Sequence, residues 1–246
     1  MKIIINGANG RMGHMLAACA EQTEGVEIAA RVSRSFTLNP EAGIYQTLEQ
    51  FTGEADCVID FSNHTQTGNL LGYCVMRSLP VVIATTGQSE EELRQIQTAI
   101  DDIPVFLSAN MSLGVAVLAD LAKRTAAMFP DADIEIIERH HNQKLDAPSG
   151  TALLLARRIC EAAGEKKFVL GHSGHAKREP DEIGIHALRY GSETGTHEII
   201  ISNGSETLTL KHEAENRALF ARGAMVAAKA LVAMQPGLYD MRDIVE

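Results

Sequence analysis

Apolar residues in the first half of the chain occur as short β-branched runs, separated by longer stretches with helical periodicity. The runs expected to form strands are residues 2–6, 26–32, 57–61, 80–84 and 105–108. The stretches expected to form helices are residues 12–21 and 67–77, a segment capped near Ser89, and residues 113–128. Strands that alternate with helices pair in parallel, because each helix returns the chain to the same edge of the sheet. The pattern therefore predicts an α/β fold with a doubly wound parallel sheet.

The pattern changes after residue 128. Further strands are expected at residues 133–139, 185–189, 197–202 and 207–211, with one clear helix among them at residues 151–163. Strands without intervening helices predict a second, α+β domain with a mixed or antiparallel sheet. The long polar segment 164–184 is expected to be a mobile lid or an interface loop. A last amphipathic helix near residues 214–234 can pack on the first domain. We therefore expect one domain from residues 1–112 and 217–246, and another from residues 113–216.

A glycine-rich turn follows the first strand. Gly7, Gly10 and Gly13 are spaced G-x-x-G-x-x-G between the strand and an apolar helix. This is the context of a Rossmann-type dinucleotide-binding turn, in which glycines let the backbone approach a pyrophosphate. Asn9, at the centre of the turn, tolerates left-handed backbone geometry better than most residues. The turn is therefore expected to bind a dinucleotide.

The end of the second strand bears on which nicotinamide cofactor fits. Enzymes restricted to NADH usually carry an acidic residue roughly 20 positions beyond the glycines, which accepts from the ribose 2′-hydroxyl. This chain has Ser33 there, with Arg31 and Arg34 near it. The two arginines can pair with a 2′-phosphate by charge-assisted hydrogen bonds, or they can be solvated surface charges. We expect NADPH to be used at least as well as NADH.

Residues 138–152, ERHHNQKLDAPSGTA, concentrate titratable side chains at a predicted strand end. His140 and His141 precede Lys144, and Ser149 precedes an apolar helix. Histidine and lysine donate protons, and backbone N–H groups at a helix start favour a bound carboxylate. A polar loop followed by an ordinary helix cap could have the same sequence. The combination of histidines, a lysine and a helix start directly after a strand nevertheless indicates a site that binds and protonates an acidic small molecule.

Composition excludes several classes of protein. The net charge of −10 over 246 residues argues against a general nucleic-acid binder. No stretch approaches the ~20 apolar residues of a membrane span, and the first residues do not form a signal peptide. The four cysteines are scattered, which favours reduced thiols, so we expect a cytoplasmic protein. His172 and His175 lack cysteine or carboxylate partners, so no metal is expected.

With these pieces placed, the chain resembles the 4-hydroxy-tetrahydrodipicolinate reductase (dihydrodipicolinate reductase) family of the diaminopimelate route to lysine. The resemblance runs nearly end to end. It rests on GANGRMG at 7–13, ATTG at 84–87, SANMSLG at 108–114, ERHHNQKLDAPSGTA at 138–152 and GLYDMRDIV at 237–245. It implies reduction of 4-hydroxy-tetrahydrodipicolinate to tetrahydrodipicolinate with NADPH or NADH. It also implies homotetramers built by joining the sheets of the second domain.

The resemblance implies a role for individual residues. His140 and Lys144 would be the proton donors, and His141, Gly150 and Thr151 would bind the dicarboxylate substrate. The residues that would hold the cofactor, from the pyrophosphate to the nicotinamide, are Gly7, Ala8, Asn9, Gly10, Arg11, Met12, Arg34, Ala84, Thr85, Thr86, Ser108, Ala109, Asn110 and Met111.

Three positions depart from the family pattern. Ser33 replaces an acidic residue of many members, Ala84 stands where glycine is common, and Asn63 stands where some members have arginine. These departures bear on cofactor preference more than on the reaction. Two alternatives stay open. Another NAD(P)-dependent dehydrogenase should lack the HHNQK–PSGT combination, and an NADPH-binding module without turnover would not need a His-Lys pair.

Overall fold

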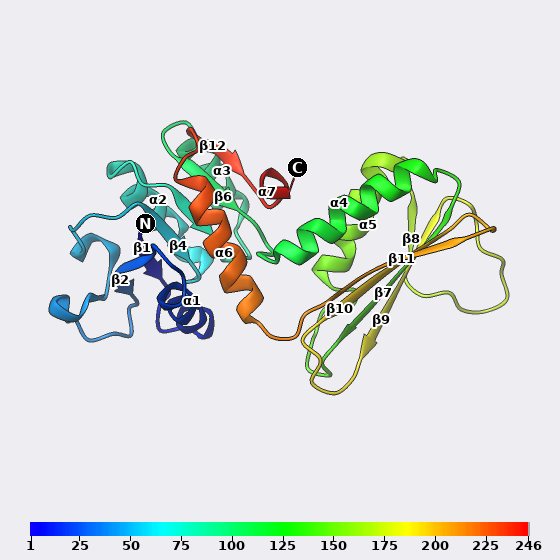
Figure 1. Ribbon diagram of the computed structural model, residues 1–246, viewed down its shortest axis with the longest axis horizontal. Helices are drawn as coiled ribbons and strands as arrows, with labels where there is room; N and C mark the ends of the chain where they lie inside the picture. Colours follow the sequence, from blue (N-terminus) through cyan, green and yellow to red (C-terminus); the bar gives the residue numbers. More distant parts are fainter. Residues whose placement is uncertain (246) are drawn as a thin grey trace. The chain divides into compact units, whose positions relative to one another are not determined.

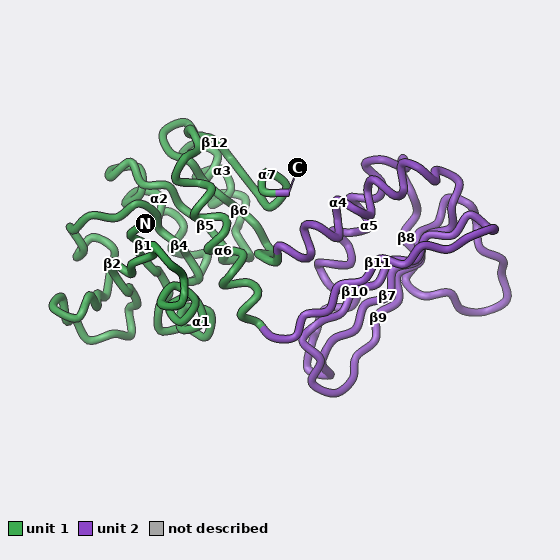
Figure 2. Tube along the Cα trace, in the orientation of Figure 1, with its two compact units in different colours: residues 1–112, 217–244 green, residues 113–216, 245–246 purple. Residues whose placement is uncertain are grey.

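The computed structural model describes residues 1–245, which form two compact units (Figures 1 and 2). The first unit comprises Met1–Ser112 and Arg217–Ile244, and the second comprises Leu113–Asn216, with Val245 grouped with it. Residue 246, which the sequence pattern places in the first domain, lies outside the described residues. The polypeptide therefore leaves the first unit once and returns to it through its last helices and strand.

A parallel sheet forms the centre of the first unit. In the described chain it has seven strands in the order β12-β6-β5-β4-β1-β2-β3. The strands are β1 (Lys2–Asn6), β2 (Glu27–Val32), β3 (Ile44–Tyr45), β4 (Cys57–Asp60), β5 (Val81–Ile83), β6 (Pro104–Leu107) and β12 (Gly237–Tyr239). The helices are α1 (Arg11–Glu21), α2 (Thr67–Met76), α3 (Glu90–Ala99), α6 (Ala218–Leu231) and α7 (Arg242–Val245), with short 3₁₀ turns at Pro40–Ala42, Leu48–Gln50 and His64–Gln66.

Both faces of this sheet are covered, because its strands are apolar on both sides. Ile4 of β1 shares a buried cluster with Leu70 of α2 and Ile96 of α3. The neighbouring Ile3 and Ile5, also fully buried, point to the opposite face. On that face α1 packs against α6, and α6 packs against β4, β5 and β6. The predicted doubly wound, Rossmann-type sheet is thus confirmed, and its strand order reverses between β1 and β4.

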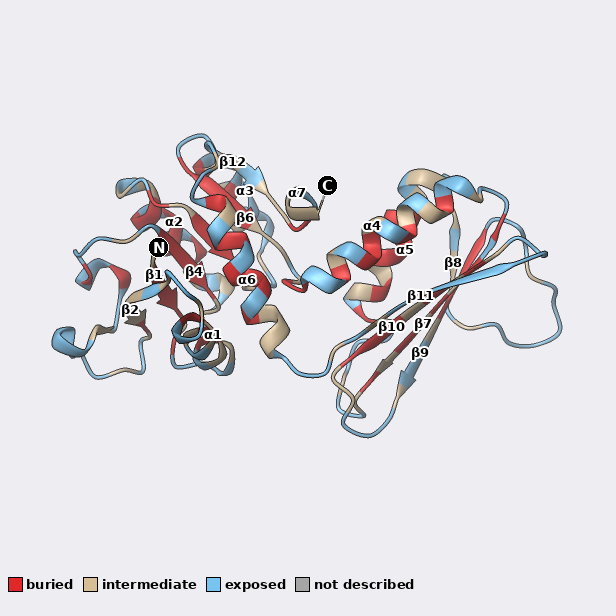
Figure 3. Cartoon of the chain, viewed as in Figure 1, coloured by how far each residue is buried: buried red, intermediate tan, exposed pale blue. Residues whose placement is uncertain are grey.

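The second unit is a mixed sheet with helices on one face (Figure 1). Its strands run in the order β11-β10-β7-β9-β8, with β10 antiparallel to both neighbours and the other pairs parallel. The elements are α4 (Leu113–Met128), β7 (Asp133–His140), α5 (Gly150–Ala163), β8 (Lys167–Val169), β9 (Glu182–Arg189), β10 (Thr196–Ser202) and β11 (Thr207–Glu213). Apolar residues of α4, α5 and alternate strand positions form one buried core. Figure 3 marks the buried residues along these helices and strands. The α+β prediction for this half is confirmed.

Two predicted segments differ from the structure. The polar segment 164–184 contains β8, and β9 already starts at Glu182. Arg178 anchors the loop between them, since its guanidinium donates to the carbonyl oxygens of Ile134 at 3.2 Å and Glu182 at 2.6 Å. The last long helix is also shorter than the predicted 214–234, because Ala214 still pairs by its backbone N–H with the carbonyl of Gly195.

Candidate functional site

The glycine turn joins β1 to α1 in the first unit, and its geometry requires glycine. Gly7 has a φ of +82°, and a Cβ there would lie 2.6 Å from the backbone carbon of Phe61. A Cβ on Gly13 would collide with the backbone of Gly7 and Ala8. Asn9 does not adopt the left-handed geometry that asparagine tolerates: Gly7 holds that conformation, and the Asn9 amide donates to the Ser35 hydroxyl at 2.8 Å.

A cavity of about 960 Å³ opens beside this turn, within the size range of small-molecule sites. Gly7, Asn9 and Gly10 line it from one side, and Ser33 and Arg34 line it from the end of β2. Backbone that a Cβ would obstruct, next to a hydroxyl and a guanidinium, fits the phosphates and ribose of a dinucleotide. Of the other predicted pyrophosphate residues, Ala8 is buried, and Arg11 and Met12 begin α1.

The structure does not bring both predicted arginines to this cavity. Arg31 donates to the carboxylate of Glu21 on α1 at 3.0 Å, so its charge is already paired. Arg34 is exposed and lines the cavity. The interpretation that two arginines flank a 2′-phosphate is therefore wrong for Arg31, because a nearer carboxylate holds it.

A smaller cavity of about 230 Å³ lies at the same edge of the sheet, after β4 and β5. Ala84, Thr85 and Thr86 line it together with residues 61–64. Asn63, which departs from the family pattern, caps the 3₁₀ turn by accepting from the Thr65 backbone N–H at 3.0 Å. Its side-chain oxygen is thus used for local structure.

The remaining predicted cofactor residues lie on the next loop along this edge, after β6. Ser108 and Asn110 shape that loop, since the Asn110 N–H donates to the Ser108 hydroxyl at 3.3 Å. Met111 is only 2% exposed. Ala109 lies between them. The predicted cofactor residues therefore fall on four loops, after β1, β2, β5 and β6, at the carboxyl edge of one parallel sheet.

In the second unit, the inward-facing positions of β7 are apolar in its first half and polar in its second half. Ile134, Ile136, Glu138 and His140 all face the core, and the residues between them are only half-buried or exposed. Glu138 is fully buried and His140 is 8% exposed. A buried carboxylate must be paired and hydrogen-bonded to be stable.

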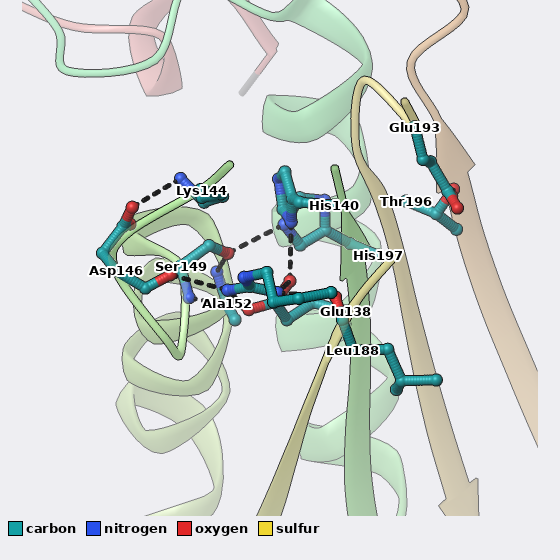
Figure 4. Close-up of polar contacts among 11 residues, drawn as sticks. Glu138, His140, Lys144, Asp146, Ser149, Ala152, Leu188, Glu193, Thr196 and His197 are labelled. Atoms are coloured by element: carbon teal, nitrogen blue, oxygen red, sulfur yellow. Dashed lines mark hydrogen bonds and ion pairs between the residues drawn. The ribbon is translucent and has the colours of Figure 1, made fainter. Parts of the chain in front are cut away.

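Four hydrogen bonds satisfy the Glu138 carboxylate. It accepts from His140 Nδ1 at 2.6 Å (Figure 4) and from the backbone N–H of Ser149 at 2.9 Å. It also accepts from both terminal nitrogens of Arg189, at 2.7 and 2.6 Å. Burial acts to raise the pKa of Glu138, but the hydrogen bonds from His140, Arg189 and Ser149 outweigh it and hold the pKa at about 2. The ionised carboxylate makes His140 Nδ1 the donor, which leaves Nε2 to exchange a proton.

A second histidine packs beside the first. The rings of His140 and His197 lie 5.2 Å apart, edge to face. His197 Nε2 is 3.1 Å from the Ser149 hydroxyl, which also caps α5 by accepting from the Ala152 backbone N–H at 3.2 Å. Burial, followed by the charge of His140, lowers the pKa of His197 to about 3. His197 is therefore neutral near neutral pH and places no positive charge beside His140.

The other predicted residues lie on the connection from β7 to α5. The Lys144 ammonium is 2.8 Å from the Asp146 carboxylate, and Figure 4 shows the two side chains turned toward each other. This contact with Lys144 lowers the pKa of Asp146. His141 is held through its backbone, whose N–H donates to the carbonyl of Glu193 at 2.9 Å. Gly150 and Thr151 form the first turn of α5, as predicted from the cap.

Sequence reasoning missed three residues of this cluster: Glu138, Arg189 and His197. The signal for Glu138 is its place on the inward side of β7, where an acidic residue continues the alternation of Ile134 and Ile136. Arg189 and His197 give no such signal, because they meet the cluster only through strand pairing of β9 and β10 with β7.

Among residues 1–245, no helix is both long and apolar enough to span a bilayer. Within the same residues, no three histidine, cysteine, aspartate or glutamate side chains are grouped so that they could hold a metal ion.

Comparison with known proteins assigns the family. Models of the dihydrodipicolinate reductase N-terminus and C-terminus match residues 1–111 and 114–245. The 4-hydroxy-tetrahydrodipicolinate reductase of Caldanaerobacter subterraneus is 45% identical over 100% of this chain and 98% of its own, and that of Clostridium tetani is 42% identical over 98% and 95%.

Solved structures agree with this assignment. A dipicolinate-bound dihydrodipicolinate reductase from Paenisporosarcina sp. superposes with a TM-score of 0.85 at 26% identity, covering 99% of both chains. An amine dehydrogenase from Mycobacterium smegmatis, 11% identical with a TM-score of 0.67 over 98% and 95% of the two chains, shares the fold alone. The chain belongs to the dihydrodipicolinate reductase family.

Proposed function

We propose that the protein reduces 4-hydroxy-tetrahydrodipicolinate to tetrahydrodipicolinate with a pyridine nucleotide, a step of diaminopimelate and lysine biosynthesis. Membership of the dihydrodipicolinate reductase family supports the reaction. The observation that carries the proposal is the buried Glu138–His140 pair on the strand that leads into Lys144 and the start of α5. The alternative, a module that binds NADPH without turnover, would not need a histidine held by a buried, ionised carboxylate.

Lys144 and His140 would supply the proton that accompanies the hydride. The nicotinamide, when bound, supplies the hydride itself. The Lys144 ammonium can pair with a substrate carboxylate and donate, which makes it the stronger candidate acid. His140 would assist through Nε2, because its Nδ1 hydrogen is bound to Glu138. Asp146 keeps Lys144 on the loop and is not assigned a proton-transfer role.

The substrate is a dicarboxylate, and the second unit offers donors for it. The backbone N–H groups of Gly150 and Thr151 lie at the start of α5, where the helix dipole favours an anion. His141 adds a side chain on the same connection. We assign substrate binding to His141, Gly150 and Thr151, and thus to the second unit.

The first unit would hold the cofactor, and NADPH should serve at least as well as NADH. Arg34 at the 960 Å³ cavity is available to a 2′-phosphate, and no acidic side chain occupies position 33. Gly7 to Met12 would hold the pyrophosphate. Residues 84–86 and 108–111 would hold the nicotinamide end.

The second unit would also form a homotetramer. One face of its sheet is covered by α4 and α5, and the other carries partly buried apolar residues such as Ile137 and Ile200. Joining such faces between subunits would remove them from water. Light scattering during size exclusion should give four times the mass of one chain.

The reaction is tested by following nicotinamide absorbance with substrate made from pyruvate and aspartate semialdehyde by a purified synthase. NADPH and NADH are compared side by side. Oxidation that depends on the synthase is expected, at a rate with NADPH at least equal to that with NADH. Cofactor binding without oxidation would contradict the proposed reaction and favour a binding module.

A further inference from the structure

Asp60 is a buried carboxyl at the centre of the carboxyl edge of the first unit, and none of the roles above uses it. It ends β4, beside the end of β1, where the strand order of the sheet reverses. Ligands in such sheets bind in the crevice at this reversal. Asp60 is 2% exposed, so its side chain lies below the surface of that crevice.

Groups at the carboxyl ends of three adjacent strands, β1, β4 and β5, donate to this one carboxyl. Oδ1 accepts from the Asn6 amide at 2.7 Å, from the Ser62 hydroxyl at 2.6 Å and from the Ser62 backbone N–H at 3.3 Å. Oδ2 accepts from the Thr85 hydroxyl at 2.6 Å. Asp60 thus ties together the residue before the glycine turn and the first residues of the loops after β4 and β5.

The same three donors line the two cavities of the first unit. Asn6 and Ser62 line the larger cavity, and Ser62 and Thr85 line the smaller one. Ser62 is therefore shared, and the backbone at Phe61 and Ser62 is also the surface on which Gly7 packs. A shift of Ser62 would change both cavities at once.

The direction of the Thr85 hydroxyl follows from this arrangement. Its single hydrogen is donated to Asp60 Oδ2, so its oxygen can offer only lone pairs to a ligand. A hydrogen-bond acceptor at this place suits an amide N–H₂ group, such as the carboxamide of a nicotinamide ring. The carboxyl of Asp60, which lines neither of these two cavities, would determine whether the Thr85 hydroxyl presents a donor or an acceptor to a ligand.

We propose that Asp60 is a positioning residue of the cofactor site, which aligns the two cavities through Ser62 and presents Thr85 as an acceptor to the nicotinamide carboxamide. The inference rests on the proposed function, because it takes the two cavities to hold the two ends of one pyridine nucleotide. Asp60→Asn separates the two parts of this role. The asparagine oxygen can still accept from Asn6 and Ser62, whereas its N–H₂ group forces Thr85 to accept and to turn its own hydrogen outward.

The test compares binding of NADPH with binding of adenosine 2′,5′-bisphosphate, which lacks the nicotinamide, by titration calorimetry. For Asp60→Asn we expect the Kd of NADPH to rise roughly three- to tenfold, the worth of one hydrogen bond, and that of the bisphosphate to stay within about twofold. Thr85→Val should show the same selective loss, and the double variant should lose no more. Asp101→Asn, an exposed change at the opposite edge of the sheet, is the matched control.

The outcomes separate the inference from the proposed function. Equal weakening of both ligands by Asp60→Asn would mean that Asp60 only holds the fold together, and unchanged NADPH binding would remove its role. If Asp60→Asn does not fold, Thr85→Ser must keep NADPH affinity while Thr85→Val loses it, and equal affinities would overturn the inference. Wild-type protein that binds neither ligand would instead refute the cofactor site itself.

Discussion

Replacing Glu138 with glutamine keeps the size of a fully buried side chain and removes its charge. In the wild type the carboxylate accepts from His140, Ser149 and twice from Arg189. Glutamine can accept with one oxygen only, and its amide nitrogen must face two of these donors, because each carboxylate oxygen now accepts from two. The Arg189 guanidinium also loses its buried counter-charge, which is the costly way to break a buried ion pair.

The size of the effect follows from the pKa. The pKa of Glu138 is held at about 2, against an ordinary value of 4.5. This difference corresponds to roughly 3 kcal/mol in favour of the ionised form in the folded protein. For a chain of this length, such a loss lowers the melting temperature by roughly 6–12 °C. Turnover should also fall, because the negative charge that fixes the His140 Nδ1 hydrogen is lost, whereas NADPH affinity should not change.

Calorimetry at pH 7 measures the melting temperature, with Glu198→Gln as the control. Glu198 lies on β10 of the same sheet and pairs with the partly exposed Arg139 at 3.3 Å, so its loss should cost less than about 1 kcal/mol. The pH dependence supplies a second check. Since the folded pKa of Glu138 is lowered, its contribution is present above pH 4.5 and is lost between about pH 4.5 and 2. The two melting curves should therefore converge in acid. Equal melting temperatures at pH 7 would refute the reasoning.

Two further predictions concern the cofactor site and the second histidine. Arg34→Ala should raise the KM for NADPH roughly tenfold and leave the KM for NADH unchanged. Arg31→Ala should change neither KM, because Glu21 already pairs with Arg31. Equal effects of the two variants on the KM for NADPH would contradict this prediction. The pKa of His197 is lowered to about 3, so the unfolded chain takes up a proton that the folded protein does not, and the wild type loses stability as the pH falls from 6.5 toward 3. His197→Gln should lose less stability than the wild type between pH 7 and pH 5 in thermal unfolding, and parallel losses would show that His197 does not remain neutral.

Most of the fold follows from local patterns of the sequence. The predicted strand 2–6 and helix 113–128 coincide with β1 and α4, because each is specified by its own periodicity. The strands missed are short: β3 has two residues, and β8 and β12 have three each. Such strands exist because a neighbouring strand pairs with them, and three residues are too few to show an alternation.

The candidate site also has one part that can be predicted from the sequence and one part that cannot. The glycine turn and the His140–Thr151 stretch are each a continuous segment, so their chemistry can be predicted from the sequence. The partners that make His140 useful are distant: Arg189 is 51 residues from Glu138 in sequence, and His197 is 48 from Ser149. Arg31 shows the opposite error, since a sequence neighbour of the cofactor site is held elsewhere by Glu21. The tertiary packing of strands and helices decides which of these side chains meet.

The most direct test of the account is the turnover of Lys144→Ala with NADPH and synthase-generated substrate, measured beside its NADPH affinity. Lys177→Ala, which removes an exposed lysine from the β8–β9 loop, is the control. If Lys144 donates the proton, its loss should lower kcat by roughly 10²–10⁴-fold, with NADPH binding near that of the wild type. Full turnover by Lys144→Ala would contradict the assignment of proton transfer to the connection between β7 and α5.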